Sequence, residues 1–236
     1  MVDISWHLPC LLYTSPSPLT HGKGCKLYDA DGNEYLDFLA GIAVNSLGHA
    51  HPALVKAISE QAAKLMHCSN IYYTDIQAKA VKEIIETTGF DRVFLANSGA
   101  EANEGAIKLA RKYGHQKNEG KYRIITAVHS FHGRTMMTVT ATGQPKYQQG
   151  YEPLPAGFDY VPYGDLEALR EAMDEDVCCV LLEPIQGEGG VHVPSDTYLH
   201  EARLLCDKYD ALLVFDEIQT GVARTGKWFA YMHSGV

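Results

Sequence analysis

The chain has 236 residues, of which 46% are hydrophobic and 21% are charged, and its formal net charge at pH 7 is -9. Such a composition is ordinary for a folded protein with one substantial core or two small domains. The negative charge argues against nucleic acid or an anionic membrane surface as a partner, and no apolar run approaches the roughly 18 residues of a membrane span.

Residues 1–20 are expected to form an irregular arm. They contain several prolines and no sustained hydrophobic period, so they are interpreted as lying outside the domains or even as foreign to them. From Gly24, two short segments flank Asp31 and Gly32, which predicts a β-hairpin that reaches Phe38. The boundary between this N-terminal segment and the rest of the chain is predicted near residue 60.

Two helices are predicted next. Pro52 suits the first position of a helix, and an apolar stripe follows it through residue 65. Thr74 and Gln77 have the spacing of a capping box, and Gly89 is a suitable end for the second helix.

Strands and helices then alternate. The predicted strands are residues 92–96, 123–128, 160–161, 177–182 and 211–215. The predicted helices are residues 99–113, 165–173 and 197–209, whereas residues 136–142 fit either a helix or a strand. Repeated β-α-β units with strongly apolar strands predict an α/β fold with a mainly parallel sheet and helices on both faces.

The last predicted strand ends at two carboxylates. Residues 211–215 form an uninterrupted apolar run, which predicts a strand buried on both faces. Asp216 follows at the carboxyl end, the edge where open parallel sheets bind ligands, and a carboxylate there needs a partner. A protonated ring nitrogen of a cofactor fits this role. Capping of a following helix or an ion pair with Arg224 are the alternatives.

Residues 97–103 lie where a strand is predicted to turn into a helix. Ser98 and Glu101 have capping-box spacing, and Gly99 lets the backbone come close to a ligand. The free N–H groups of such a helix start can hold a phosphate, although a capping box often only caps.

Two further loops leave predicted strand ends. Residues 130–134 offer the ring of Phe131 for stacking on a flat cofactor and the guanidinium of Arg134 for a carboxylate. A packed Phe131 and a solvated Arg134 are the alternative. Residues 182–190 are rich in glycine and carboxylates, a composition that is also typical of a merely flexible loop.

Taken together and in this order, these strand-end motifs resemble those of the class III pyridoxal-phosphate aminotransferases. The motifs are Asn-Ser-Gly-Ala-Glu-Ala-Asn (97–103), Ser-Phe-His-Gly-Arg (130–134), Glu-Pro-Ile-Gln-Gly-Glu-Gly-Gly (183–190) and Phe-Asp-Glu-Ile-Gln-Thr-Gly (215–221). Residues 41–52 and 67–70 resemble the acetylornithine aminotransferase branch in particular. The resemblance, from about residue 22 to 226, implies fold type I. Residues 21–60 then form the N-terminal part of a small α+β domain, and residues 61–236 an incomplete large cofactor-binding domain.

The resemblance implies roles for individual residues around pyridoxal 5'-phosphate. The backbone N–H groups of Gly99 and Ala100 hold the phosphate. Phe131 stacks on one face of the pyridine ring, and Ile218 packs on the opposite face.

The remaining implied contacts are polar. Asp216 pairs with the protonated ring nitrogen and serves catalysis, because it keeps the cofactor an effective electron sink. Gln219 approaches the ring's 3-hydroxyl. Arg134 binds a substrate carboxylate, and Glu188 lies near the substrate's amino end or holds an arginine away between half-reactions.

The implied function is transfer of an amino group between N-acetylornithine and 2-oxoglutarate in arginine biosynthesis, by a cytoplasmic homodimer. Ornithine, succinylornithine and succinyl-diaminopimelate aminotransferases are alternatives, as is a non-catalytic cofactor-binding fragment. The sequence lacks GxGxxG and GxSxG, which argues against a dehydrogenase or hydrolase.

Cysteine and histidine spacing adds little to these functions. The six cysteines have no CxxC spacing, so we expect reduced thiols in a cytosolic protein rather than a disulfide scaffold. The pairs His49 with His51 and His129 with His132 lack convergent Cys or carboxylate neighbours at ligand spacing, and no metal site is predicted.

The resemblance also implies a Schiff-base lysine a few dozen residues beyond Asp216. Lys227 is the only lysine after Asp216, and its surroundings, Arg-Thr-Gly-Lys-Trp-Phe, do not match that position. We therefore expect that the chain is truncated at its C-terminus, lacks the Schiff-base lysine and is inactive by itself.

Overall fold

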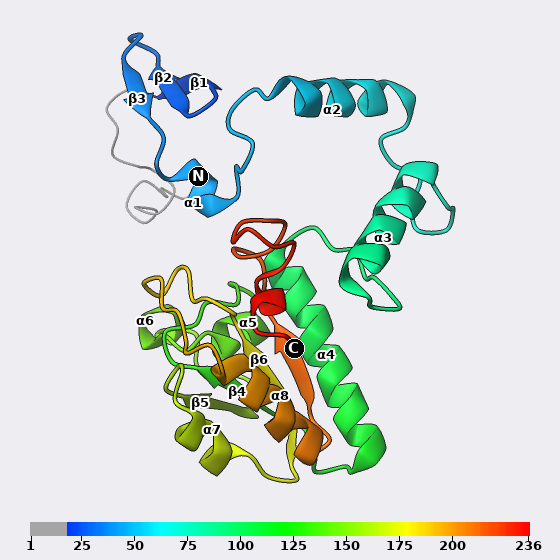
Figure 1. The fold of residues 1–236 in the computed structure, drawn as a ribbon, viewed down its shortest axis with the longest axis vertical. Helices are drawn as coiled ribbons and strands as arrows, with labels where there is room; N and C mark the ends of the chain where they lie inside the picture. The colour runs from blue at the N-terminus through cyan, green and yellow to red at the C-terminus, as the bar shows by residue number, and fades with distance from the viewer. Residues whose placement is uncertain (1–17) are drawn as a thin grey trace, which may run out of the picture. The chain divides into compact units, whose positions relative to one another are not determined.

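The computed structural model describes residues 18–236, the part of the chain drawn in colour in Figure 1. The chain divides into two compact units, Met1–Tyr73 and Thr74–Val236. The predicted N-terminal arm lies mostly outside the described residues, while Leu19 and Thr20 belong to the first strand. The domain boundary near residue 60 stays a prediction.

The described part of the first unit begins with a three-stranded antiparallel sheet of order β1-β2-β3. Its strands are β1 Leu19–Lys23, β2 Lys26–Asp29 and β3 Glu34–Leu36. In the turn between β2 and β3, buried Asp29 accepts hydrogen bonds from the N–H groups of Asp31 (3.0 Å) and Asn33 (2.9 Å). The predicted hairpin is therefore confirmed, and β1 is a strand that the sequence pattern did not indicate.

The short segment α1 Ala40–Ala43 and the helix α2 Pro52–Lys64 follow in this unit. Gly41 and Ile42 have φ angles of 65° and 63°, so α1 is not a regular right-handed helix. Pro52 occupies the first turn of α2, as predicted. The apolar stripe of α2 is not buried, since Leu54 and Ile58 are 44% and 60% exposed. Within residues 18–73 the stripe thus forms an open apolar surface.

The second unit contains a four-stranded, wholly parallel sheet of order β5-β4-β6-β7 among its described residues. Its strands are β4 Arg123–Ala127, β5 Phe158–Val161, β6 Val177–Leu182 and β7 Leu212–Phe215. Every residue of β6 is buried, as expected for a central strand with both faces covered.

Helices cover both faces of this sheet. The helical segments are α3 Asp75–Thr88, α4 Gly99–Lys117, α5 Met136–Ala141, α6 Pro145–Gln148, α7 Leu166–Ala172, α8 Tyr198–Lys208 and η1 Ala230–His233. In β4, Ile124 packs into a cluster with Ile107 of α4, and Ile125 into a cluster with Leu169 of α7. The predicted α/β fold class is confirmed (Figure 1).

Two predicted strands differ from the structure. Residues 92–96 form no strand, because their backbone pairs with no other strand among residues 18–236, and Phe94 is 75% exposed. Strand β7 exists, but its residues are only partly buried instead of buried on both faces. It pairs with β6 alone, so its outer edge is open within the described residues.

The described residues contain neither a disulfide nor a cluster of side chains arranged to hold a metal. Their cysteines are free thiols, namely Cys25, Cys68, Cys178, Cys179 and Cys206, while Cys10 lies outside the described residues. Of the helices within residues 18–236, none combines the length and the apolar character that a bilayer crossing requires.

Candidate functional site

A cavity of about 300 Å³ lies at the carboxyl ends of β4, β6 and β7, next to the start of α4. All of the site residues predicted from the sequence line it, namely Gly99, Ala100, Phe131, Arg134, Glu188, Asp216, Ile218 and Gln219. Sequence reasoning assigned no role to the other lining residues, which are Asn103, His132, Gly133, Glu183 and Ile185. The parallel strands bring the loops together because their carboxyl ends share one edge of the sheet.

The start of α4 forms one wall of the cavity. Ser98 Oγ accepts a hydrogen bond from the N–H of Glu101 at 3.2 Å, so Ser98 caps the helix as predicted. The Glu101 carboxylate does not return to Ser98 but accepts from the N–H of Asn97 at 2.8 Å. The N–H groups of Gly99 and Ala100 belong to the first helical turn, where no carbonyl of the helix can accept them.

Gly99 also allows a close approach across the cavity. A Cβ atom at this position would lie 2.7 Å from Ile218 Cγ1, too close for an ordinary contact. Ile218 follows β7 and is 54% exposed. Phe131 lines the same cavity, and its ring meets the ring of Tyr147 edge-on at a centroid distance of 5.6 Å.

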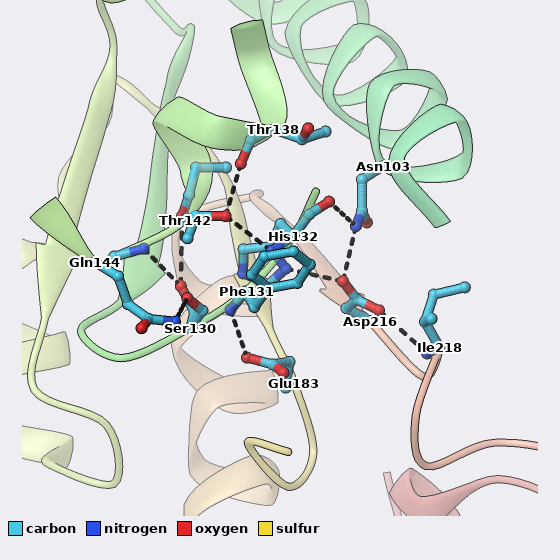
Figure 2. A network of polar contacts seen from close by, with 12 residues as sticks. Asn103, Ser130, Phe131, His132, Thr138, Thr142, Gln144, Glu183, Asp216 and Ile218 are labelled. Atoms are coloured by element: carbon cyan, nitrogen blue, oxygen red, sulfur yellow. Dashed lines mark hydrogen bonds and ion pairs between the residues drawn. The ribbon is translucent and has the colours of Figure 1, made fainter. Parts of the chain in front are cut away.

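The side chain of Asp216 is buried and accepts several hydrogen bonds (Figure 2). Its Oδ2 accepts from Asn103 Nδ2 at 2.7 Å and lies 2.9 Å from His132 Nδ1, while its Oδ1 accepts from the N–H of Ile218 at 3.1 Å. Burial raises the pKa of Asp216, but the hydrogen bond and charge of His132 and the amide of Asn103 together hold that pKa below its usual value. Asp216 is therefore a carboxylate at neutral pH.

His132 and Asn103 tie Asp216 to the loop after β4. Asn103 Nδ2 donates both to Asp216 and to the carbonyl of His132 at 2.9 Å, and the N–H of His132 donates to Thr142 Oγ1 at 2.9 Å. An ionised carboxylate only accepts, so His132 Nδ1 must carry a proton. His132 Nε2 is buried without a hydrogen-bond partner.

Glu183 is a second buried carboxyl group of the cavity and accepts from the N–H of Phe131 at 3.1 Å. Burial raises the pKa of Glu183 to about 7, and the charge of Asp216 acts in the same direction. The nearby His132 and the hydrogen bond from Phe131 oppose this rise. At neutral pH Glu183 is therefore partly protonated, whereas Asp216, which has side-chain donors from His132 and Asn103, is ionised.

Arg134 and Glu188 line the cavity near α6. The Arg134 guanidinium lies over the ring of Tyr147, with Cζ 4.5 Å from its centroid. Glu188 Oε2 accepts from Gln144 Nε2 at 2.6 Å, and Glu188 Oε1 accepts from the Tyr147 hydroxyl. Arg134 forms no ion pair with a carboxylate in residues 18–236.

Gln219 lines the cavity, whereas Lys227 does not. Gln219 lines it and lies against Gly187, where an added Cβ atom would overlap Gln219 Oε1 at 1.8 Å. Lys227 is not among the lining residues, and its Nζ donates to the carbonyl of Met232 at 2.9 Å.

Known proteins resemble this chain in sequence and in fold. Residues 13–236 match the family described as Aminotransferase class-III. An acetylornithine aminotransferase from Caldanaerobacter subterraneus subsp. tengcongensis is 57% identical over 94% of this chain and 56% of its own length. A succinylornithine transaminase/acetylornithine aminotransferase from Pseudomonas aeruginosa is 54% identical over 91% of this chain and 53% of its own length. The chain thus spans about half the length of these relatives.

Solved structures agree with the sequence comparison. The N-acetylornithine aminotransferase from Stenotrophomonas maltophilia superposes with a TM-score of 0.82 at 42% identity, over 97% of this chain and 58% of that one. The ornithine aminotransferase from Toxoplasma gondii superposes with a TM-score of 0.91 at 39% identity, over 97% of this chain and 55% of that one.

Proposed function

Because the chain belongs to the class III aminotransferase family, we propose that the cavity at the carboxyl edge of its sheet binds pyridoxal 5'-phosphate. The observation that carries this proposal is the buried carboxylate of Asp216, held ionised in a cavity that also receives the start of α4. A carboxylate of this kind suits a protonated pyridine nitrogen. The N–H groups of Gly99 and Ala100, at the positive end of the α4 dipole, suit a phosphate.

The other lining residues suit the ring itself. Phe131 and Ile218 offer apolar surfaces to a flat ring, and Gln219 offers a polar group to its hydroxyl. When bound, pyridoxal phosphate supplies an electron sink for the bonding electrons released at the substrate carbon that bears the amino group. Asp216 supports this chemistry because its carboxylate keeps a proton on the ring nitrogen.

The proposed reaction of the complete protein is amino-group transfer between N-acetylornithine and 2-oxoglutarate, a step of arginine biosynthesis. Support comes from the acetylornithine aminotransferase that is 57% identical and from the N-acetylornithine aminotransferase structure. In the cavity, Arg134 offers a substrate carboxylate a guanidinium that is not paired with a carboxylate of residues 18–236. Glu188 is proposed to face the amino end of the substrate.

A succinylated donor is the second candidate, because the relative from Pseudomonas aeruginosa is named for both succinylornithine and acetylornithine. Free ornithine is a further candidate from the likeness to ornithine aminotransferase. The two acylated donors have an uncharged amide where ornithine has a second ammonium group. The preference among these amino donors therefore depends on the protein surface that contacts this amide or ammonium group.

We further propose a cytoplasmic homodimer, with residues 21–60 in a small domain and residues 61–236 in a large one. Burial raises the pKa of Cys178 to about 11 and that of Cys206 to about 12, which keeps both thiols protonated. Exposed apolar side chains on α2 and α3, such as Ile58 and Ile76, offer surface for association.

The test of the reaction is a comparison of amino donors. The complete protein, saturated with pyridoxal phosphate, is incubated with 2-oxoglutarate and with N-acetylornithine, succinylornithine, succinyl-diaminopimelate or ornithine, and glutamate is measured by mass spectrometry. We expect the largest kcat/KM with N-acetylornithine. A larger value with another donor would reassign the substrate, and no glutamate with any donor would contradict the aminotransferase proposal.

A further inference from the structure

Tyr147, which does not line the cavity, connects two residues that do. It belongs to α6, and its ring lies beneath the guanidinium of Arg134, 4.5 Å from Cζ to the ring centroid. Its hydroxyl donates to Glu188 Oε1. One side chain thus contacts both groups that are proposed to meet the substrate's charged ends.

Glu188 is held by neutral donors rather than by a cation. Besides the Tyr147 hydroxyl, Gln144 Nε2 donates to Glu188 Oε2 at 2.6 Å. Gln144 is itself buried and anchored, because the same Nε2 donates to the carbonyl of Ser130 at 2.9 Å. Burial raises the pKa of Glu188, but the bonds from Tyr147 and Gln144 and the charges of Lys146 and Arg134 bring that pKa below its usual value. Glu188 is therefore ionised at neutral pH.

Arg134 is supported by rings rather than by a carboxylate. Its Cζ lies 4.5 Å from the centroid of the Tyr147 ring and 5.7 Å from that of Phe131. A guanidinium over a ring face spends no N–H group on that contact, so its N–H groups stay available to bind a carboxylate with two parallel hydrogen bonds. Glu188 is ionised, and the charge of Arg134 helps to lower its pKa. The two side chains nevertheless form no ion pair.

We propose that Tyr147 is a positioning residue that allows this site to accept a dicarboxylate, because its ring supports Arg134 and its hydroxyl holds Glu188 away from Arg134. The inference rests on the proposed function. Without the hydroxyl, Glu188 gains freedom to pair with Arg134 and then competes with the carboxylate of the ligand. Tyr147 therefore acts on substrate selection through Glu188.

The test measures binding of glutarate, a five-carbon dicarboxylate without the oxo group, to the protein loaded with pyridoxal phosphate. Tyr147→Phe keeps the ring and removes only the hydroxyl. Calorimetry is expected to show a Kd for glutarate that rises roughly tenfold, the effect of about one charge-assisted hydrogen bond. Adding Glu188→Gln to Tyr147→Phe removes the competing charge and is expected to restore the affinity of the Glu188→Gln single variant.

A matched control is Tyr151→Phe, since Tyr151 lies just beyond α6, is 58% exposed and does not line the cavity. It is expected to leave the glutarate affinity unchanged, and Tyr147→Phe is expected to keep the cofactor affinity of the unmodified protein. Equal glutarate affinity in Tyr147→Phe and the unmodified protein would overturn the inference. So would a loss that Glu188→Gln does not reverse, because Tyr147 would then serve the fold alone.

Two further outcomes separate this inference from the proposed function. If the protein binds pyridoxal phosphate and transaminates but does not bind glutarate, the proposed role of Tyr147 in dicarboxylate binding is wrong. The proposed cofactor site is then unaffected. A protein that does not bind pyridoxal phosphate contradicts the proposed function itself, and the role of Tyr147 with it.

Discussion

His132 Nδ1 lies 2.9 Å from Asp216 Oδ2, and the His132 side chain has no exposed surface. The two residues follow different strands, β4 and β7, which β6 separates in the sheet. Asn103 of α4 donates to the same carboxylate oxygen. Contacts between segments far apart in the sequence thus fix both the charge and the direction of the group proposed to hold the cofactor ring.

Asn103→Ala is expected to lower the free energy of unfolding by about 1–3 kcal/mol, because two buried acceptors, the His132 carbonyl and Asp216 Oδ2, lose a donor. Urea denaturation measures this change. Asn70→Ala, at an exposed position, is the control and is expected to have little effect. An Asn103→Ala protein as stable as the control would show that this amide contributes nothing to the network.

Gly99→Ala is expected to weaken pyridoxal-phosphate binding roughly tenfold, since the added methyl group overpacks the contact with Ile218 beside the helix start. Gly105→Ala is the matched control in the same helix, because its Cβ would meet only the exposed ring of Phe94, at 3.1 Å. Fluorescence titration with the cofactor compares the two variants. Equal cofactor affinities would argue against a phosphate at the start of α4.

Much of the fold could be predicted because its signals are local. Strand β6 has the predicted bounds, and the cap of α3 is the predicted one, with the N–H of Gln77 donating to Thr74 Oγ1 at 3.4 Å and Gly89 ending the helix at a φ of 74°. Residues 92–96 show where prediction from local sequence patterns fails. Their apolar run satisfies the local pattern, but a strand also needs a neighbour, which a local pattern does not specify.

Arg134→Lys is expected to raise the KM for 2-oxoglutarate roughly tenfold with a smaller change in kcat, because a point ammonium cannot reproduce the planar fork of the guanidinium. Steady-state kinetics of the complete protein with varied 2-oxoglutarate measure this split. Arg170→Lys, on the exposed side of α7, is the control. Unchanged kinetics in Arg134→Lys would show that Arg134 does not bind the substrate carboxylate and is a solvated side chain.

Glu183 is expected to make stability depend on pH. Burial, together with the charge of Asp216, raises its pKa from 4.5 to about 7. The folded state then retains a proton that the unfolded chain releases, so the contribution of Glu183 is fully present below pH 4.5 and is lost as pH rises through about 7. Glu183→Gln is expected to reduce this decline by up to about 3 kcal/mol.

Urea denaturation across that pH range tests the role of Glu183. Glu171→Gln, at an exposed position on α7, is the control and is expected to keep the decline of the unmodified protein. If Glu183→Gln also kept the full decline, the carboxyl group of Glu183 would titrate normally.

From the residues alone, the candidate site could be predicted where a residue type itself indicates chemistry, whereas Ala100, Ile218 and Gln219 followed only from the family resemblance. Asp216 after an apolar run and Arg134 beside an aromatic residue are such cases. Asn103 and His132 lay within the quoted motifs, but their roles arise from contacts with Asp216 across 113 and 84 sequence positions. Tyr147 stands outside every motif. His132 lies on a loop that leaves the end of β4, and this position is the one sequence signal of its role.

The most direct test of the proposed site is a titration with pyridoxal phosphate, followed by absorbance, on the unmodified protein and on Asp216→Ala, with exposed Asp196→Ala as the control. We predict saturable binding by the unmodified protein and by the control. In Asp216→Ala we predict a Kd roughly ten- to a hundredfold higher, because a charge-assisted hydrogen bond to the ring nitrogen is lost. The same Kd in Asp216→Ala as in the unmodified protein would contradict the assignment of Asp216 and of the cavity around it.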